Sequence, residues 1–418
     1  MVYSNSEIGP LEKVIIHRPD LGISRISPKR AEELLFDDIV HLPTMQEEHD
    51  IFSDLLKSVL GPEAVYESQD LLLEALNENV DRKRELIAKA LDYDELPASY
   101  VDDLIELDNE ILVDVLITGY DATNDFYYFD PIPNFIFTRD IAVTVNDHVI
   151  ITKAAKIARF RENLLTRFIF YTHPMFKELR DADKIINLNN IEKFPPSRYG
   201  ETVSMEGGDI MIIENDYLLI GVSERSTDHA FRSIRDVLFE KKVVKHVVMV
   251  NIPSDRSCMH IDTLFTRIDK DHVVCFKPIV YEGKGSNVEL FSIDGHHKTY
   301  SSIKDFFLNE INPDMKFVFS GGGHSPYQER EQWTDGCNLV ALKPGVGITY
   351  DRNHRTGEAF QNMGFEIKKA EDVIKEIKEG SLKASDIENT IITVPSGELS
   401  RARGGSHCMT CPILRQSI

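Results

Sequence analysis

The residue best suited to nucleophilic chemistry is Cys408, which lies near the chain end in Arg403-Gly-Gly-Ser-His-Cys408. Positive charge beside a thiol favours the thiolate, which is the nucleophilic form of cysteine. The two glycines let the backbone turn sharply and approach a ligand closely. Chemistry this close to a terminus requires a tail that is tied into the core. The alternative is a structural cysteine in a C-terminal strand, because free cysteine is often buried.

Three further segments carry acid–base residues. In His260-Ile-Asp262 the two titratable side chains would share one face of a strand, and histidine changes charge near neutral pH. Glu206-Gly-Gly-Asp209 and Thr138-Arg-Asp140 add carboxylates. The alternative for each segment is a surface pair or an ordinary turn, since Asp and Gly favour turns.

Zinc binding is a second possible use of the cysteines. Cys258, His260, Cys408 and Cys411 could supply four ligands. That site would consume both His260 and Cys408, so we expect no metal.

The acid–base segments and Cys408 stand at the starts of repeated units. We expect β-hairpins at 135–152, 209–222, 261–276 and 338–350, with one turn at Asn215-Asp216. Each hairpin leads to a helical stretch (162–179, 227–239, 301–310, 356–363) and then to a short apolar strand (185–186, 243–250, 317–319, 365–367). A fifth unit would combine residues 14–16 and 28–60 with 390–394 and the tail.

This repetition favours a closed radial α/β array over an ordinary α/β protein. In such an array the hairpin starts converge, so the acidic residues, the histidine and the thiol would surround one pocket. Residues 68–120 do not fit the unit, because their Leu, Ile and Val residues recur at helical spacing among many Asp and Glu. We therefore expect one catalytic domain, 1–418, with a helical insertion at 68–120.

Composition limits the classes of function. The net charge of −22 disfavours nucleic acid as a partner. No segment is apolar and long enough for a membrane span, and the N-terminus has no signal-peptide pattern. The 5 cysteines are few and odd in number, which argues against a disulfide framework and for the cytoplasm.

An ordered series of motifs resembles the arginine deiminase family from end to end. The series comprises Ser6-Glu-Ile-Gly9, Val14-Ile-Ile-His-Arg-Pro19, Phe137-Thr-Arg-Asp140, Glu206-Gly-Gly-Asp209, Met259-His-Ile-Asp-Thr263, Arg330-Glu-Gln-Trp-Thr-Asp-Gly336, Tyr350-Asp-Arg-Asn353 and Arg403-Gly-Gly-Ser-His-Cys408. The resemblance implies a five-fold pseudosymmetric α/β propeller, the pentein fold. It also implies hydrolysis of L-arginine to L-citrulline and ammonia without a cofactor.

The resemblance assigns catalytic roles to five residues. Cys408 would attack the guanidinium carbon and form an amidino-thioether. His260 would protonate the leaving ammonia and then activate water, and Glu206 would orient it. Asp140 and Asp262 would grip the guanidinium N–H groups.

Six further positions match substrate contacts. Arg159, Arg225 and Asn134 would bind the substrate carboxylate, and Asn353 would contact the amino-acid end. Phe137 would lie against the guanidinium plane, and Arg403 would sit near the thiol of an empty site.

Several carboxylates around one thiol oppose its ionisation. A bound guanidinium reverses that effect, so we expect the substrate itself to activate Cys408. The alternatives are another guanidine hydrolase or an amidinotransferase of the same fold, a binding protein that has lost catalysis, and a zinc hydrolase. We also expect a homo-oligomer.

Overall fold

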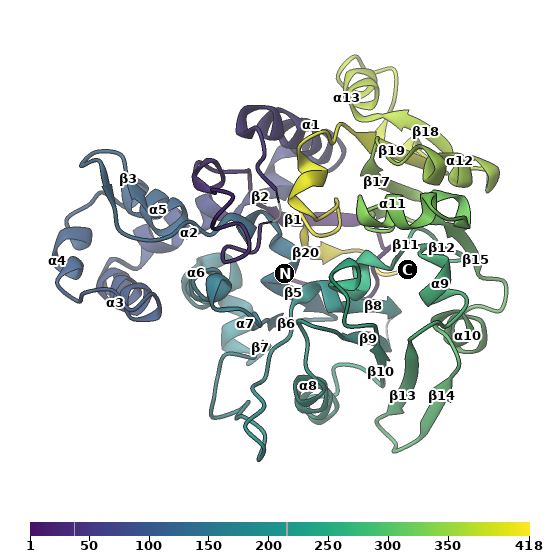
Figure 1. Ribbon diagram of the computed structural model, residues 1–418, viewed down its shortest axis with the longest axis horizontal. Helices are drawn as coiled ribbons and strands as arrows, with labels where there is room; N and C mark the ends of the chain where they lie inside the picture. The colour runs from purple at the N-terminus through teal and green to yellow at the C-terminus, as the bar shows by residue number, and fades with distance from the viewer. Residues whose placement is uncertain (37, 215) are drawn as a thin grey trace.

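The protein is a mixed α/β structure of several small sheets (Figure 1). The computed structural model describes residues 1–36, 38–214 and 216–418. The sheet orders are β2-β1-β20, β5-β6-β7, β14-β13-β10-β9-β8, β11-β12-β15, β16-β17-β19-β18 and β3-β4. The strands are β1 Leu11–Ile16, β2 Val65–Glu67, β3 Tyr120–Asp121, β4 Phe126–Tyr127, β5 Ala142–Val145, β6 His148–Ile151, β7 Ile185–Asn187, β8 Ile210–Glu214, β9 Tyr217–Val222, β10 His246–Asn251, β11 Phe265–Arg267, β12 His272–Cys275, β13 Asn287–Ser292, β14 His297–Tyr300, β15 Lys316–Phe319, β16 Val340–Lys343, β17 Val346–Tyr350, β18 Glu366–Lys369, β19 Thr390–Val394 and β20 Cys411–Arg415.

The four predicted hairpin units are confirmed. In each, two consecutive strands pair antiparallel, as β5 and β6 do, and the second strand pairs in parallel with a strand further along the chain, as β6 does with β7. The turn residues Asn146 and Gly345 have φ of 51° and 77°, the left-handed conformation that Asn and Gly accept most readily. The predicted turn at Asn215-Asp216 lies partly outside the described residues.

At least one helix stands between each hairpin and the strand that pairs with it in parallel, since a parallel pair needs a crossover connection. These connecting helices are α6 Phe160–Thr172 with α7 Lys177–Asp181, α8 Asp228–Glu240, α10 Ile303–Phe306 and α12 His354–Asn362. In the fourth unit the predicted strand at 365–367 overlaps β18, which pairs with β19 and not with β17. The predicted helix at 301–310 continues from α10 as a π-helical turn over Phe307–Ile311.

The predicted strand starts are wrong at the ends of the hairpins that carry the acid–base residues. Residues 138–140, 207–209 and 261–263 form short 3-10 turns, and the strands begin after them. His260 and Asp262 are therefore not two residues of one strand. Buried polar side chains explain the difference, because Asp140, Asp209 and Asp262 bond to groups outside the sheet ladder.

The two ends of the chain lie side by side. Strand β20 pairs antiparallel with β1, as expected for a tail tied into the core. Figure 1 shows these strands near the centre of the molecule. The predicted fifth unit is wrong in one part, because residues 390–394 form β19 between β17 and β18. The helical part predicted at 28–60 is the helix α1 Leu42–Leu60, which packs against α13 Ala370–Lys378.

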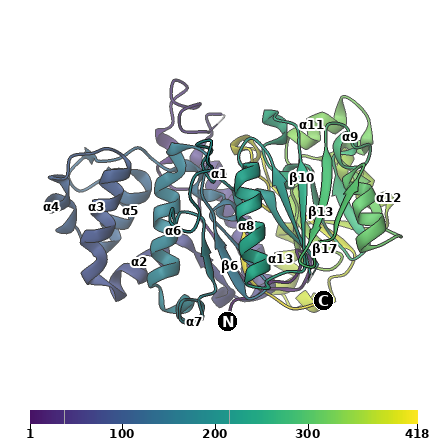
Figure 2. The same ribbon diagram turned by 90° about the horizontal axis from the view of Figure 1, so that it is seen from below.

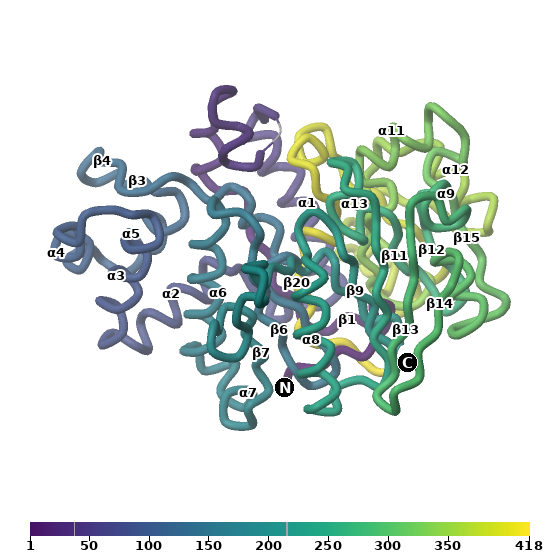
Figure 3. Tube along the Cα trace, turned by 60° about the horizontal axis from the view of Figure 1, so that its bottom comes forward, coloured from purple at the N-terminus to yellow at the C-terminus, as the bar shows by residue number. Residues whose placement is uncertain are grey.

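Residues 68–120 contain four α-helices that follow one another along the chain. They are α2 Ser68–Glu78, α3 Lys83–Tyr93, α4 Tyr100–Ile105 and α5 Asn109–Thr118. Their apolar faces join a core cluster that also contains Ile15, Ile151 and Leu165. Figures 1, 2 and 3 all place α3, α4 and α5 at one end of the molecule, away from β10 to β17.

The remaining elements include α9 Lys277–Val280 and α11 Tyr327–Trp333. Strands β13 and β14 extend the β8–β10 sheet and were not expected from the sequence. Within the described part of the chain, no helix combines the length and apolarity needed to cross a membrane.

Candidate active site

One cavity of about 1410 Å³ collects the ends of the repeated units. Its lining includes Asp140 after β4, His260 between β10 and β11, and Cys408 just before β20. The turn 207–209 packs against both 138–140 and 261–263, so residues far apart in sequence meet at one place. The expected convergence of these segments is therefore present.

Cys408 is buried at the base of this cavity with two polar neighbours. Its Sγ lies 3.2 Å from Asn338 Nδ2, which donates to it, and 3.4 Å from Asp262 Oδ2. The amide oxygen of Asn338 also accepts from the Cys408 backbone N–H at 3.1 Å. Burial raises the pKa of the Cys408 thiol well above its ordinary value, and the charges of Asp262, Asp140 and Asp335 raise it further. Cys408 is therefore a thiol, not a thiolate, at neutral pH.

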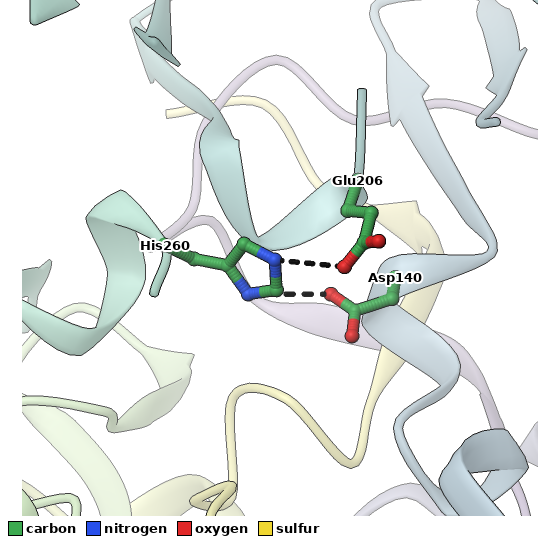
Figure 4. A group of neighbouring side chains, drawn as sticks. All are labelled: Asp140, Glu206 and His260. Carbon is green, nitrogen blue, oxygen red and sulfur yellow. Dashed lines mark hydrogen bonds and ion pairs between the residues drawn. The ribbon is translucent and has the colours of Figure 1, made fainter. Parts of the chain in front are cut away.

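His260 faces two carboxylates, which lie on the same side of its ring (Figure 4). Its Nε2 is 3.0 Å from Glu206 Oε2 and its Nδ1 is 3.8 Å from Asp140 Oδ1. Burial alone would lower the pKa of His260, but the charge of Asp140 and the hydrogen bond to Glu206 raise it to about 10. The imidazole is therefore protonated at neutral pH and can act as a general acid.

Gly208 packs against the His260 imidazole, and its lack of a side chain makes space for the ring. A Cβ on Gly208 would lie 2.6 Å from His260 Nδ1. Gly208→Ala should therefore displace the ring and lower kcat by on the order of 10²-fold, the typical effect of a misplacement of about 1 Å. Steady-state kinetics would measure this loss. Gly357→Ala is the matched control, because nothing lies within 4 Å of that Cβ position; an equal loss in both variants would contradict the steric argument.

Arg159 occupies the acidic side of the site. Its Nη1 lies 2.7 Å from Asp140 Oδ2 and 3.2 Å from Glu206 Oε2, and its Nη2 lies 2.8 Å from Glu162 Oε2. All four side chains are buried. The guanidinium of Arg159 thus pairs with Asp140, a carboxylate that was expected to hold the guanidinium of a substrate.

Four other predicted residues line the same cavity. Arg225 lies 3.7 Å from Glu206 and has a buried Nε without a partner among the described residues. Asn134 donates to the Leu34 carbonyl. Phe137 covers Gly404 so closely that a Cβ there would lie 2.2 Å from its ring. The guanidinium of Arg403 stacks 3.2 Å from the centre of the Trp333 ring.

Asn353 is not brought to the cavity lining. Its amide accepts from the Thr334 hydroxyl at 2.6 Å and donates to the Thr334 carbonyl at 2.9 Å. Asn353 thus joins the end of α11 to the start of α12.

The proposed zinc ligand set does not gather. Among the described residues, Cys258, His260, Cys408 and Cys411 form no cluster with metal-ligand spacing. Cys411 Sγ instead donates to the Ala142 carbonyl at 3.2 Å. Asp140, Glu206 and His260 do lie close enough to hold an ion, but the Arg159 cation already pairs with both carboxylates.

The sequence reasoning missed three residues of the site. Asn338 bonds to both the sulfur and the backbone of Cys408, Glu162 holds Arg159, and His407 bonds to Asp262 at 2.9 Å. His407 belongs to the tail motif, and Asn338 follows shortly after the motif that ends at Gly336. Both residues therefore lie in or next to motifs that the sequence analysis singled out. Their contacts depend on segments far away in the chain.

Solved structures show which fold this is. An amidinotransferase from Microseira wollei superposes with a TM-score of 0.54 at 13% identity, covering 100% of this chain and 98% of that chain. A dimethylarginine dimethylaminohydrolase superposes with a TM-score of 0.51 at 13% identity, covering 96% and 99%. At such low identity the likeness concerns the fold alone, and the protein has the pentein fold of these enzymes.

Sequence relatives are more specific. An arginine deiminase of Limosilactobacillus reuteri is 30% identical over 446 residues, covering 100% of this chain and 98% of the relative. One of Bacillus cereus is 32% identical over 451 residues, covering 100% and 99%. The sequence profile of arginine deiminase matches residues 32–104 and 103–415. The chain belongs to the arginine deiminase family.

Proposed function

We propose that the protein hydrolyses L-arginine to L-citrulline and ammonia through a covalent bond to Cys408. The observation that carries the proposal is the position of the Cys408 thiol, 3.4 Å from the Asp262 carboxylate in a cavity that Asp140 and His260 also line. A cationic guanidinium fits between such carboxylates and would lie beside the sulfur.

Substrate binding activates the nucleophile. The same acidic groups that raise the pKa of Cys408 attract a guanidinium, and its positive charge then stabilises the thiolate. The thiol proton leaves to solvent. The sulfur attacks the central guanidinium carbon, and the resulting tetrahedral adduct expels one nitrogen as ammonia, which takes its proton from the His260 imidazolium.

Hydrolysis of the amidino-thioether completes the reaction. His260, now neutral and still oriented by Glu206, accepts a proton from water, and the hydroxide adds to the same carbon. The hydroxyl proton of this second tetrahedral adduct is lost to solvent, the carbon–sulfur bond breaks, the sulfur leaves as thiolate, and the carbonyl of citrulline forms. Asp140 and Asp262 hold the two nitrogens that stay on the former guanidinium carbon after ammonia has left.

The far end of the substrate would meet Arg225 and Asn134. Arg225 lines the cavity, and its Nε–H group has no partner among the described residues, which suits the α-carboxylate of a free amino acid. Arg159 can join them if its guanidinium leaves Asp140 when substrate enters. The proposed contact of Asn353 with the amino-acid end would require its side chain to leave Thr334.

The fold proposal follows from the sheets. We infer that the sheets centred on β1, β6, β9, β12 and β17 are the five blades of a pseudosymmetric propeller, with residues 68–120 inserted as helices into one domain spanning 1–418. The shared ββαβ order of four units and the β1–β20 pairing support it.

Location and assembly remain predictions. The five cysteines, all free in the described structure, favour a reducing compartment such as the cytoplasm. A homo-oligomer is also expected.

The function is tested by incubating purified protein with L-arginine, agmatine and methylated arginines, with and without glycine or ornithine. We expect equal amounts of citrulline and ammonia from L-arginine. Transfer of the amidino group to glycine or ornithine would support the amidinotransferase alternative. Loss of activity in strong chelator would revive the zinc alternative.

The pH dependence follows from His260 and Asp262. The pKa of about 10 keeps His260 protonated until strongly alkaline pH. Burial would raise the pKa of Asp262, but its hydrogen bond to His407 lowers it, so Asp262 stays ionised in mild acid. We expect kcat/KM to hold through neutral pH and to fall as pH rises toward 10.

The variant Glu206→Gln tests this assignment. Loss of the Glu206 charge lowers the pKa of His260, so the alkaline fall in kcat/KM should begin at lower pH than in the wild type. A pH–rate profile with an unmoved alkaline limb would assign that limb to another group.

A further inference from the structure

A buried chain of charged groups connects the first residues of the protein to the nucleophile. The His407 ring lies between Asp262 and Glu7, with Nδ1 2.9 Å from Asp262 Oδ2 and Nε2 3.3 Å from Glu7 Oε2. Glu7 Oε1 in turn accepts from Arg139 Nη2 at 2.6 Å. All four side chains are buried. His407 is therefore enclosed by groups from the N-terminal segment and from the turn before β11.

Both carboxylates beside His407 are kept ionised. Burial would raise the pKa of Glu7, but the charge of Arg139 and the bond to His407 hold it well below its ordinary range, with Arg415 contributing. The pKa of Asp262 is likewise lowered by its bond to His407 against the effect of burial, and His260 and Arg139 add to that lowering.

An ionised carboxylate can only accept hydrogen bonds. Both ring nitrogens of His407 face such oxygens, so both contacts are made only when both nitrogens carry a proton. The geometry thus selects the imidazolium form. A neutral ring would turn a lone pair toward one of the two carboxylates.

The Asp262 carboxylate is placed by this contact. Its Oδ2 receives the His407 bond and lies 3.4 Å from Cys408 Sγ. Its Oδ1 is buried and has no hydrogen-bond partner among the described residues. A buried acceptor without a partner is costly, and this one is available for an N–H group of a ligand.

We propose that His407 is a positioning residue, held as an imidazolium by Glu7, that fixes Asp262 and places a positive charge beside the Asp262–Cys408 pair. The inference rests on the proposed function for its effect on turnover. Its effect on the thiol does not, because the charge acts on Cys408 whether or not the protein hydrolyses arginine. In this arrangement the imidazolium offsets part of the acidic surroundings that oppose thiolate formation.

The first test is alkylation of Cys408 by iodoacetamide at pH 9, followed by peptide mass mapping to separate Cys408 from the other cysteines. His407→Gln keeps a hydrogen-bonding side chain and removes the charge. We expect its alkylation rate constant to fall about tenfold, which corresponds to one pKa unit, and its kcat/KM for arginine to fall about 100-fold. His272→Gln is the matched control, since His272 is a buried histidine with a carboxylate partner, Asp271, at 2.7 Å.

The second test uses Glu7→Gln, which removes the group that holds the outer ring proton. Without that carboxylate the His407 ring keeps only its bond to Asp262, so Asp262 is held less firmly beside the sulfur, and the rate constant for alkylation of Cys408 should fall as it does in His407→Gln. A residue that only supported the fold would lower the melting temperature and leave this rate constant unchanged.

The outcomes separate the proposals. Alkylation rate constants of His407→Gln and Glu7→Gln that both match the wild type would overturn the role of His407. Absence of citrulline from the wild type would overturn the proposed function, while alkylation would still report on His407. If neither variant folds, neutron diffraction of the wild type near pH 7 decides: we expect deuterium on both ring nitrogens, and a singly deuterated ring would refute the inference.

Discussion

Replacing Cys408 by serine is expected to abolish citrulline formation, with a loss in kcat on the order of 10⁴- to 10⁶-fold, as for other enzymes that lose their nucleophile. Serine keeps the size and the hydrogen bonds to Asn338. However, its hydroxyl ionises far less readily than a thiol among carboxylates, and a bound guanidinium cannot make up that difference. Citrulline production under saturating arginine would measure the effect.

Two controls make the Cys408→Ser result specific. Arginine should still protect the variant against thermal unfolding, because the carboxylates that bind guanidinium are unchanged. Cys258→Ser removes a buried thiol outside the cavity lining and should keep its turnover. Turnover by Cys408→Ser above about 1% of the wild type would remove Cys408 from the nucleophile role.

The largest expected effect on stability comes from Arg159→Met. The change leaves the carboxylates of Asp140, Glu162 and Glu206 buried without their shared cation. Breaking a buried ion pair by removing one partner costs about 3–5 kcal/mol. We expect a loss of this size in the free energy of unfolding at pH 7, measured by urea denaturation, and a smaller loss in acid, where protonation neutralises the carboxylates.

Arg232→Met is the matched control for that loss. Arg232 pairs with Asp228 at 2.6 Å, but their side chains are 61% and 43% exposed. Such surface pairs contribute about 0–1 kcal/mol. Equal losses in the two variants would show that Arg159 is not the structural cation of the acidic cluster.

The hairpins and their helices were predictable because their signals are local. Apolar residues recur at strand spacing on either side of Asn146 and Gly345, and amphipathic stretches follow. The conformation of the first residues of each hairpin was not predictable. Residues 135–141, for example, have the apolar content of a strand but do not form one. What bends this segment into 3-10 turns is the burial of Asp140 against Arg159 and the backbone of Gly208, which no local pattern records.

The position of β19 shows the same limit for sheets. Residues 390–394 are apolar enough for any central strand, and sequence adjacency to the tail suggested the N-terminal sheet. The strand instead pairs in parallel with both β17 and β18, and of the two C-terminal strands it is β20 that pairs with β1.

For the site, residue types and motif order predicted which side chains meet, but not how their charges pair. Cys408, His260 and Asp140 line one cavity, and Asp262 lies 3.4 Å from the Cys408 sulfur. Arg159 was expected at the far end of a substrate, yet its guanidinium pairs with Asp140, because a buried carboxylate is costly unless a cation pairs with it. His407 was in the tail motif, and its contact with Glu7 spans 400 residues of sequence.

The central claim is a covalent bond between substrate and Cys408. Rapid acid quenching of enzyme mixed with a small excess of L-arginine, followed by peptide mass mapping, tests it most directly. We predict that the peptide containing Cys408 gains the mass of one arginine less one ammonia. Citrulline formation with no such gain at Cys408, or with the gain at another residue, would contradict this account.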